Sequence, residues 1–116
     1  MPRSQEQYLR DMADSAKAAR RYVSGVSEEE FYANPMLQDA VSWRIQVIGE
    51  AATHVAAETQ LKVPSLPWRL IRGMRNRLVH EYQNVRVDIV WGTTQVDLEP
   101  MITAIQQLLD GTQTHP

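Results

Sequence analysis

The sequence of 116 residues contains no cysteine, which excludes disulfide bridges, thiolate metal sites and cysteine nucleophiles. It has no long apolar run, and its N-terminus lacks the basic, apolar and small-residue regions of a signal peptide. We therefore expect a soluble, cytoplasmic protein with no membrane contact. Five glycines and six prolines are few, and apolar residues mostly recur at intervals of three and four. This pattern predicts an all-α protein.

The length is typical of one domain, so we assign residues 1–116 to a single unit with a flexible tail over about 111–116. A capping-box pair, Ser27 and Glu30, predicts a short acidic helical turn between two longer helices. Helices joined by such short links favour an antiparallel bundle of four to five helices.

Local signals mark the starts of four longer helices. Ser4 begins a capping box, Asn34 and Pro35 can open the second helix, Ser65 is placed to cap the third, and Asp88 can start the fourth. Pro100 should kink or split the fourth. The expected apolar stripes are Tyr8, Met12, Ala16, Ala19 and Val23; Leu37, Val41, Arg44, Ile48, Ala51 and Val55; Trp68, Ile71, Met74 and Leu78; and Trp91, Leu98, Ile102, Ile105 and Leu109.

The three tryptophans, Trp43, Trp68 and Trp91, are expected in the core or in an interface, because each falls within an apolar helical segment. Gly49 lies inside the second helix, where its missing side chain could admit a neighbouring backbone; the alternative is a neutral surface glycine.

Charge is distributed unevenly along the chain. Twelve basic and fourteen acidic residues give a net charge of −2, which argues against a broad nucleic-acid-binding surface. Residues 60–80 nevertheless contain no Asp or Glu, which predicts a local site for a phosphate or an acidic partner. The alternative is that these cations pair with acids of other helices or cover a solvated face. The cations of this acid-free segment are Lys62, Arg69, Arg72, Arg75 and Arg77.

The end of the segment carries the strongest candidate for chemistry. On a continuous helix Arg75 and His80 would lie about 140° apart, whereas Asn76 and His80 share a face. Arg75 and His80 can therefore act together only if the helix unwinds near His80 or if a symmetry mate supplies one of them. This geometry predicts a site at a dimer interface.

These residue types suit RNA cleavage without a metal ion. The imidazole of His80 can take a proton from a ribose 2′-hydroxyl or give one to the departing 5′-oxygen. Arg75 can hold the negative charge of the phosphorane, and Asn76 can orient His80 or the phosphate. The three histidines are far apart in sequence and no metal-ligand motif occurs, so we expect no metal and no cofactor.

The motif and its context resemble a known family. The pattern Arg-x4-His-x-Tyr, here Arg75, His80 and Tyr82, resembles the signature of HepT-type toxins of the HEPN superfamily. The similarity covers nearly the whole chain, because further matches occur in the expected order. They are Ile48-Gly49-Glu50-Ala51-Ala52, Pro67-Trp68 and Gly73-Met74-Arg75-Asn76.

The resemblance implies a helical-bundle homodimer of the HEPN type in which the two motifs face one another across a cleft. It implies a metal-independent endoribonuclease toxin that cuts tRNA or mRNA through catalytic Arg75 and His80, supported by Asn76. It also implies an MNT-type nucleotidyltransferase antitoxin of a HepT/MntA-type pair, which adenylylates Tyr82. Arg72 and Arg77 are then RNA-binding candidates, although either could contact an acidic antitoxin or face solvent.

Alternatives remain at this point. Related HEPN domains serve as non-catalytic partners of nucleotidyltransferases, and a plain dimeric bundle would make the motif accidental. Tyr82 could close the third helix with its hydroxyl in water, His80 could cap that helix, and Arg75 could form a salt bridge. Glu50 could point toward the arginines or cover a solvated helix face.

Overall fold

The computed structural model describes residues 3–73 and 86–114, and every regular element within them is helical. This confirms the all-α prediction. The elements are α1 (Gln5–Tyr22), α2 (Glu28–Tyr32), α3 (Pro35–Thr53), α4 (Ala57–Gln60), the helical residues 68–73, α6 (Val87–Gly92), the π-helix η2 (Thr93–Asp97) and α7 (Leu98–Thr114).

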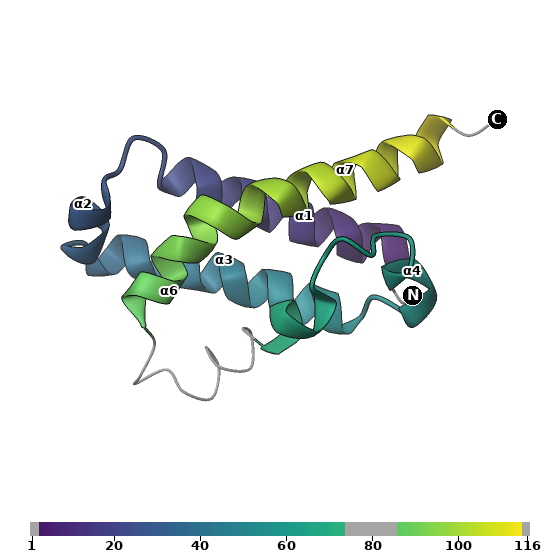
Figure 1. The fold of residues 1–116 in the computed structure, drawn as a ribbon, viewed down its shortest axis with the longest axis horizontal. Coiled ribbons are helices and arrows are strands. Elements are labelled where there is room, and N and C mark those ends of the chain that lie inside the picture. Colours follow the sequence, from purple (N-terminus) through teal and green to yellow (C-terminus); the bar gives the residue numbers. More distant parts are fainter. Residues whose placement is uncertain (1–2, 74–85, 115–116) are drawn as a thin grey trace.

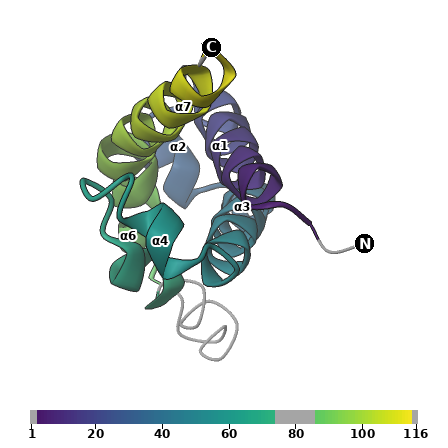
Figure 2. The ribbon, with the colours of Figure 1, turned by 90° about the vertical axis from the view of Figure 1, so that its right-hand side faces the viewer.

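The long helices form an antiparallel bundle around α1. Helix α1 packs along both α3 and α7, and it runs in the opposite direction to each of them (Figure 1). Figure 2 looks along the bundle and shows α1, α3 and α7 around a shared interior, with α4 and α6 on the remaining side. The interior includes five large, fully buried apolar side chains: Phe31, Met12, Leu98, Ile105 and Val41. Burial of each such side chain stabilises the fold by about 1.5–3 kcal/mol.

The starts of α1 and α2 confirm the local signals. The hydroxyl of Ser4 accepts from the backbone of Gln7 at 3.1 Å, and the reciprocal bond of the capping box is also present. Ser27 forms a second capping box, which begins α2. Helix α1 ends before Gly25, whose φ of +74° favours glycine because other residues rarely adopt a left-handed backbone.

The buried stripe of α3 differs from the predicted one at Arg44. Asn34 caps the helix and Pro35 lies in its first turn, as predicted. The sequence places Arg44 within the buried stripe, but its half-buried guanidinium instead bonds the Tyr22 hydroxyl at 3.0 and 3.1 Å. Ile45 takes the core position, because α3 is apolar on two adjacent faces and spacing alone does not choose between them. Gly49 is buried, so the surface alternative for this glycine is wrong.

The third predicted helix begins one turn later than its proposed cap. The backbone N–H of Ile71 donates to the carbonyl of Pro67 at 3.0 Å, so the helical residues begin at 68 and Ser65 is not the cap. Trp68 is buried, as expected, and its indole N–H donates to the carbonyl of Val63 at 3.0 Å. The predicted end of this helix near His80 lies outside the described residues.

The fourth predicted helix is interrupted before Pro100 rather than at it. Pro100 has no N–H and its ring crowds the preceding turn, and the π-helix Thr93–Asp97 lies directly on its N-terminal side. Helix α7 then continues to Thr114, past the position at which the sequence predicts the tail to begin. No helix in the described ranges has both the length and the apolar character needed to cross a lipid bilayer.

Candidate functional site

Most of the predicted site residues belong to a stretch that the structure does not describe. Arg75, Asn76, Arg77, His80 and Tyr82 all fall within residues 74–85, so the roles predicted for them stay predictions. The expected unwinding of the helix near His80 lies in the same stretch. Arg72 is the one predicted site residue within the described ranges.

The helical residues 68–73, which lie immediately before the motif, are held in place by buried side chains on one face. Trp68 and Ile71 are buried in the core, whereas Arg69 and Leu70 between them are exposed, Leu70 by 70%. Arg72 is half-buried. The core therefore fixes one side of this helical turn and leaves cations on its outer side immediately before the motif.

The cations of residues 62–72 differ from most others in the protein. Within the described part of the chain, Lys62, Arg69 and Arg72 form no hydrogen bond or ion pair. For these three residues, the alternative that they pair with acids of other helices is wrong among the described residues. No acid of the described ranges neutralises their positive charge.

On the other side of the undescribed stretch, a tight ion pair begins α6. The guanidinium of Arg86 meets the carboxylate of Asp88 in two contacts, of 2.7 and 3.2 Å. The hydrogen bond from Arg86 lowers the pKa of Asp88, and the reciprocal interaction raises the pKa of Arg86. This arginine is engaged locally, unlike the cations of residues 62–72.

Glu50 is exposed on α3, and its carboxylate lies 3.5 Å from the Nε2 of His54, one helical turn away. The side chains of Glu50 and His54 are 53% and 51% exposed, respectively. Glu50 therefore lies on a solvated face of α3, and its position relative to the motif arginines lies outside the described residues.

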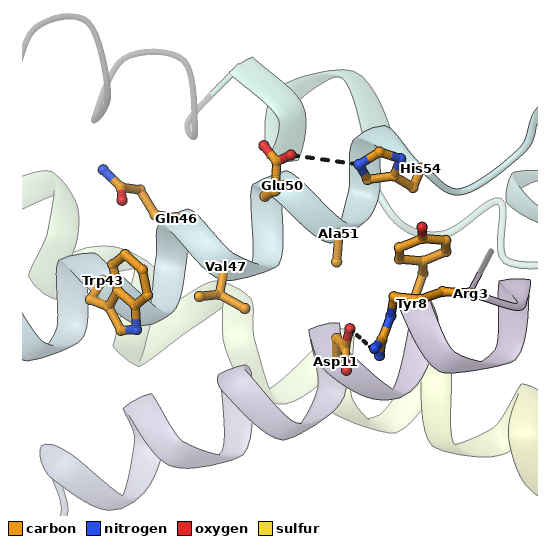
Figure 3. Close-up of a pocket in the computed structure, with 9 residues that line it drawn as sticks. All are labelled: Arg3, Tyr8, Asp11, Trp43, Gln46, Val47, Glu50, Ala51 and His54. Carbon is orange, nitrogen blue, oxygen red and sulfur yellow. Dashed lines mark hydrogen bonds and ion pairs between the residues drawn. The ribbon is translucent and has the colours of Figure 1, made fainter. Parts of the chain in front are cut away.

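Side chains of the described residues line an apolar cavity and an open trough beside α3. An apolar cavity of about 330 Å³ lies between residues 65–71 and the η2–α7 segment, and it includes Ile45 and Ile48 of α3. An open trough of about 460 Å³ lies where the outer face of α3 meets the start of α1 (Figure 3). Sequence reasoning missed this trough, because it expected Trp43 in the core or an interface and gave His54 no role.

The trough was detectable as a pattern along α3. Trp43, Val47, Glu50 and His54 follow spacings of four, three and four, so they share one face of the helix. Trp43 is 61% exposed, so it does not lie in the core of the chain, and the predicted interface position stays a prediction. Trp91 packs at a ring distance of 5.2 Å on the buried Phe31, as expected of a core tryptophan.

No group of three or more His, Asp or Glu side chains in residues 3–73 and 86–114 is arranged to hold a metal ion.

Comparison with known proteins gives a consistent result. The chain matches the family described as "Ribonuclease HepT-like" over residues 12–108. "Probable ribonuclease HepT" of Thermococcus cleftensis is 29% identical over 108 residues, which cover 93% of this chain and 98% of that protein. "Putative RNase TTE0752" of Caldanaerobacter subterraneus subsp. tengcongensis is 30% identical over 102 residues, covering 88% and 91% respectively. No solved structure matches the chain.

Proposed function

This chain belongs to the Ribonuclease HepT-like family, and from that premise we propose that it is the endoribonuclease toxin of a HepT/MntA-type toxin–antitoxin pair. One observation carries the proposal. The family match over residues 12–108 includes the complete Arg-x4-His-x-Tyr pattern of Arg75, His80 and Tyr82. Arg69 and Arg72 support it, because they lie immediately before the pattern and have no ion-pair partner among the described residues, so they can bind an RNA phosphate.

The proposed reaction is transesterification within the RNA strand. Neutral His80 removes the proton of a ribose 2′-hydroxyl, whose oxygen attacks the adjacent phosphorus. Arg75 stabilises the additional negative charge on the phosphate oxygens, and Asn76 orients the imidazole or the phosphate. The bond to the 5′-oxygen then breaks and that oxygen receives a proton, leaving a 2′,3′-cyclic phosphate and a 5′-hydroxyl. No metal ion takes part.

The proposed assembly is a homodimer, in which two copies of the motif meet at one cleft. An MNT-type nucleotidyltransferase antitoxin switches the toxin off by transferring AMP from ATP to the hydroxyl of Tyr82, which loses its proton as pyrophosphate leaves. A bulky, anionic adenylate two residues beyond His80 would occupy the cleft and satisfy arginines that otherwise bind RNA.

The test is cleavage of total RNA and tRNA by the purified protein in EDTA, after intact-mass analysis has shown that Tyr82 carries no adenylate. We expect cleavage that leaves 2′,3′-cyclic phosphate ends and is lost in His80→Ala. The matched control is His115→Ala, which removes a histidine outside the motif and should cleave like the wild type.

Cleavage that requires a metal ion and leaves 5′-phosphate ends would contradict the mechanism. If the unmodified dimer cleaves no RNA and its expression without the antitoxin does not arrest growth, the protein is instead a non-catalytic partner of the nucleotidyltransferase. Growth arrest that is relieved by Arg75→Ala would support the toxin in cells.

A further inference from the structure

The trough on the outer face of α3 has a lining whose charged groups are already paired. Arg3 bonds Asp11 at 2.7 Å, and Glu50 lies 3.5 Å from His54. Figure 3 shows these two pairs on either side of Tyr8. The charged side chains of this lining thus contact one another within the trough.

The aromatic ring of Tyr8 is also engaged. His54 stacks on it with ring centroids 4.9 Å apart and an interplanar angle of 15°, and the guanidinium of Arg3 lies 5.6 Å from the ring centroid. These contacts close the end of the trough formed by α1 and the last turn of α3 (Figure 3). They make that end a preformed wall.

The opposite end of the trough presents Trp43 and Gln46, which have no partner among the described residues. Trp43 is 61% exposed, and among the described residues neither its ring nor the amide of Gln46 forms a hydrogen bond or a ring contact. Val47 lies between this end and the Tyr8 wall as an apolar floor (Figure 3). A free indole, a neutral amide and an apolar floor suit a flat, uncharged ligand that forms hydrogen bonds at its edge.

We propose that this trough binds a nucleobase of the RNA strand that the protein cleaves, with the base stacked on Trp43 and its edge hydrogen-bonded to Gln46. Every base has a π-face that stacks on an aromatic ring, so Trp43 supplies affinity with little sequence preference. A glutamine amide can donate to and accept from adenine at once, so Gln46 favours adenine. The identity of the ligand rests on the proposed function, since RNA is the expected substrate.

The position of the trough fits one strand that also touches the cations. Residues 65–71 border α3 through Ile45 and Ile48, whereas the trough lies on the neighbouring flank, which carries Trp43 and Val47. A helix with its side chains is about 10–12 Å across, so both flanks are within reach of a short stretch of RNA. Phosphates at Arg69 and a base at Trp43 can thus belong to one strand.

The lining favours a nucleobase over a second copy of the chain. Cores of protein interfaces are depleted of charged residues, whereas Arg3, Asp11, Glu50 and His54 all line the trough. Its volume of about 460 Å³ is in the usual range for small-molecule sites.

The test measures binding apart from cleavage. The probe is a 2′-O-methyl oligoadenylate, which cannot undergo attack by a 2′-hydroxyl, and binding is followed by quenching of tryptophan fluorescence and by anisotropy of a labelled probe. We expect Trp43→Ala to weaken binding about tenfold and Trp43→Phe to retain most of it. Gln46→Ala should reduce the preference for oligoadenylate over oligouridylate. Tyr32→Ala, which removes an aromatic ring 46% exposed on α2, is the matched control and should bind normally.

Cleavage assays add a second readout, in which Trp43→Ala should raise KM about tenfold and leave kcat unchanged. Unchanged binding by Trp43→Ala would overturn the inference even if the wild type cleaves RNA. Conversely, Trp43-dependent binding by a protein that never cleaves would overturn the proposed nuclease and keep the base site. Conversion of a dimer to a monomer by Trp43→Ala in sedimentation would also overturn the inference and assign the face to a second copy.

Discussion

Cations of residues 3–44 have a different environment from those between residues 62 and 72. Arg3, Arg10, Arg20 and Arg44 each contact a partner within the described chain, such as Glu6 for Arg10 and the Tyr22 hydroxyl for Arg44; Arg21 is the exception. Lys62, Arg69 and Arg72 contact none in the same ranges. Arg20 and Arg44 tie α1 to other helices, whereas Arg3 and Arg10 pair with acids of α1 itself. The second set has no acid partner in the described ranges.

The largest expected effect contrasts a paired cation of α1 with Arg75, which belongs to the same acid-free segment as the second set. Arg75→Ala should lower the rate of RNA cleavage by roughly 100- to 1000-fold, because it removes a donor to the transition-state charge. Arg10→Ala, which breaks an exposed ion pair on α1, should change the rate less than about twofold. Single-turnover cleavage rates test this prediction, and equal losses in the two variants would show that Arg75 acts only through the fold.

The next largest expected effect is on the salt dependence of RNA binding, which should depend on the second set of cations. Each phosphate contact contributes about −0.7 to the slope of log K against log salt for a single strand. The double variant Arg69→Ala/Arg72→Ala should therefore reduce the magnitude of the slope by about 1.4. Arg21→Ala is a demanding control, since Arg21 is exposed and unpartnered in the described chain but lies outside the acid-free segment. A comparable change of the slope in Arg21→Ala would show that RNA binding does not distinguish the acid-free segment from the rest of the protein.

The free energy of unfolding should respond in the opposite way, because loss of a paired cation should cost more than loss of a cation from residues 62–72. Arg20 donates to the carbonyl of Thr94 at 2.9 Å and lies 3.5 Å from Glu99, so it ties α1 to η2 and α7. Arg20→Ala should cost about 1 kcal/mol of unfolding free energy, because its partly exposed position weakens a charge-assisted bond. Arg69→Ala should stay within about 0.5 kcal/mol. Urea denaturation measures both, and a greater loss for Arg69→Ala would contradict its proposed role as a free cation.

The smallest expected effect is a pH dependence outside the acid-free segment. Hydrogen bonds from Ser27 lower the pKa of Glu30, and Arg86 lowers that of Asp88. A lowered pKa in the folded state means that the unfolded chain binds more protons in acid, so this stabilisation is present above the ordinary carboxyl pKa. It is lost as pH falls through the folded pKa values. Carbon-detected NMR titration should find the pKa values of Glu30 and Asp88 below those of the same residues in unfolded peptides.

The elements that could be predicted from sequence are those fixed by local contacts. Ser4, Ser27 and Asn34 each bond a backbone N–H three residues away, so a short pattern contains nearly all the information. The buried members of the α1 stripe, such as Met12 and Ala16, were equally predictable because that helix is apolar on one face only.

The face of α3 was harder, because apolar residues occupy two adjacent sides of it. Val41, Ile45 and Ile48 pack in the core, whereas Trp43 and Val47 face the trough. Periodicity identifies residues that share a side, but contacts with α1 and residues 65–71 decide which side is buried. The Arg-x4-His-x-Tyr pattern identified the candidate site by its residue types, whereas the pairing state of Arg69 and Arg72 depends on acids distant in sequence.

The π-helix also sets the angular phase of the last third of the chain. Val90 and Leu98 are both buried, yet residues eight apart on an uninterrupted α-helix point about 80° away from each other. One extra residue absorbed between them brings the angle to about 20°, as if they were seven apart. The segment Thr93–Asp97 thus works as a spacer of one residue, which lets α6 and α7 present a single continuous seam to the bundle. Deletion of one residue from this segment, combined with replacement of Pro100 by a residue that an α-helix tolerates, would leave that seam intact. Insertion of a further residue would rotate the seam out of the core.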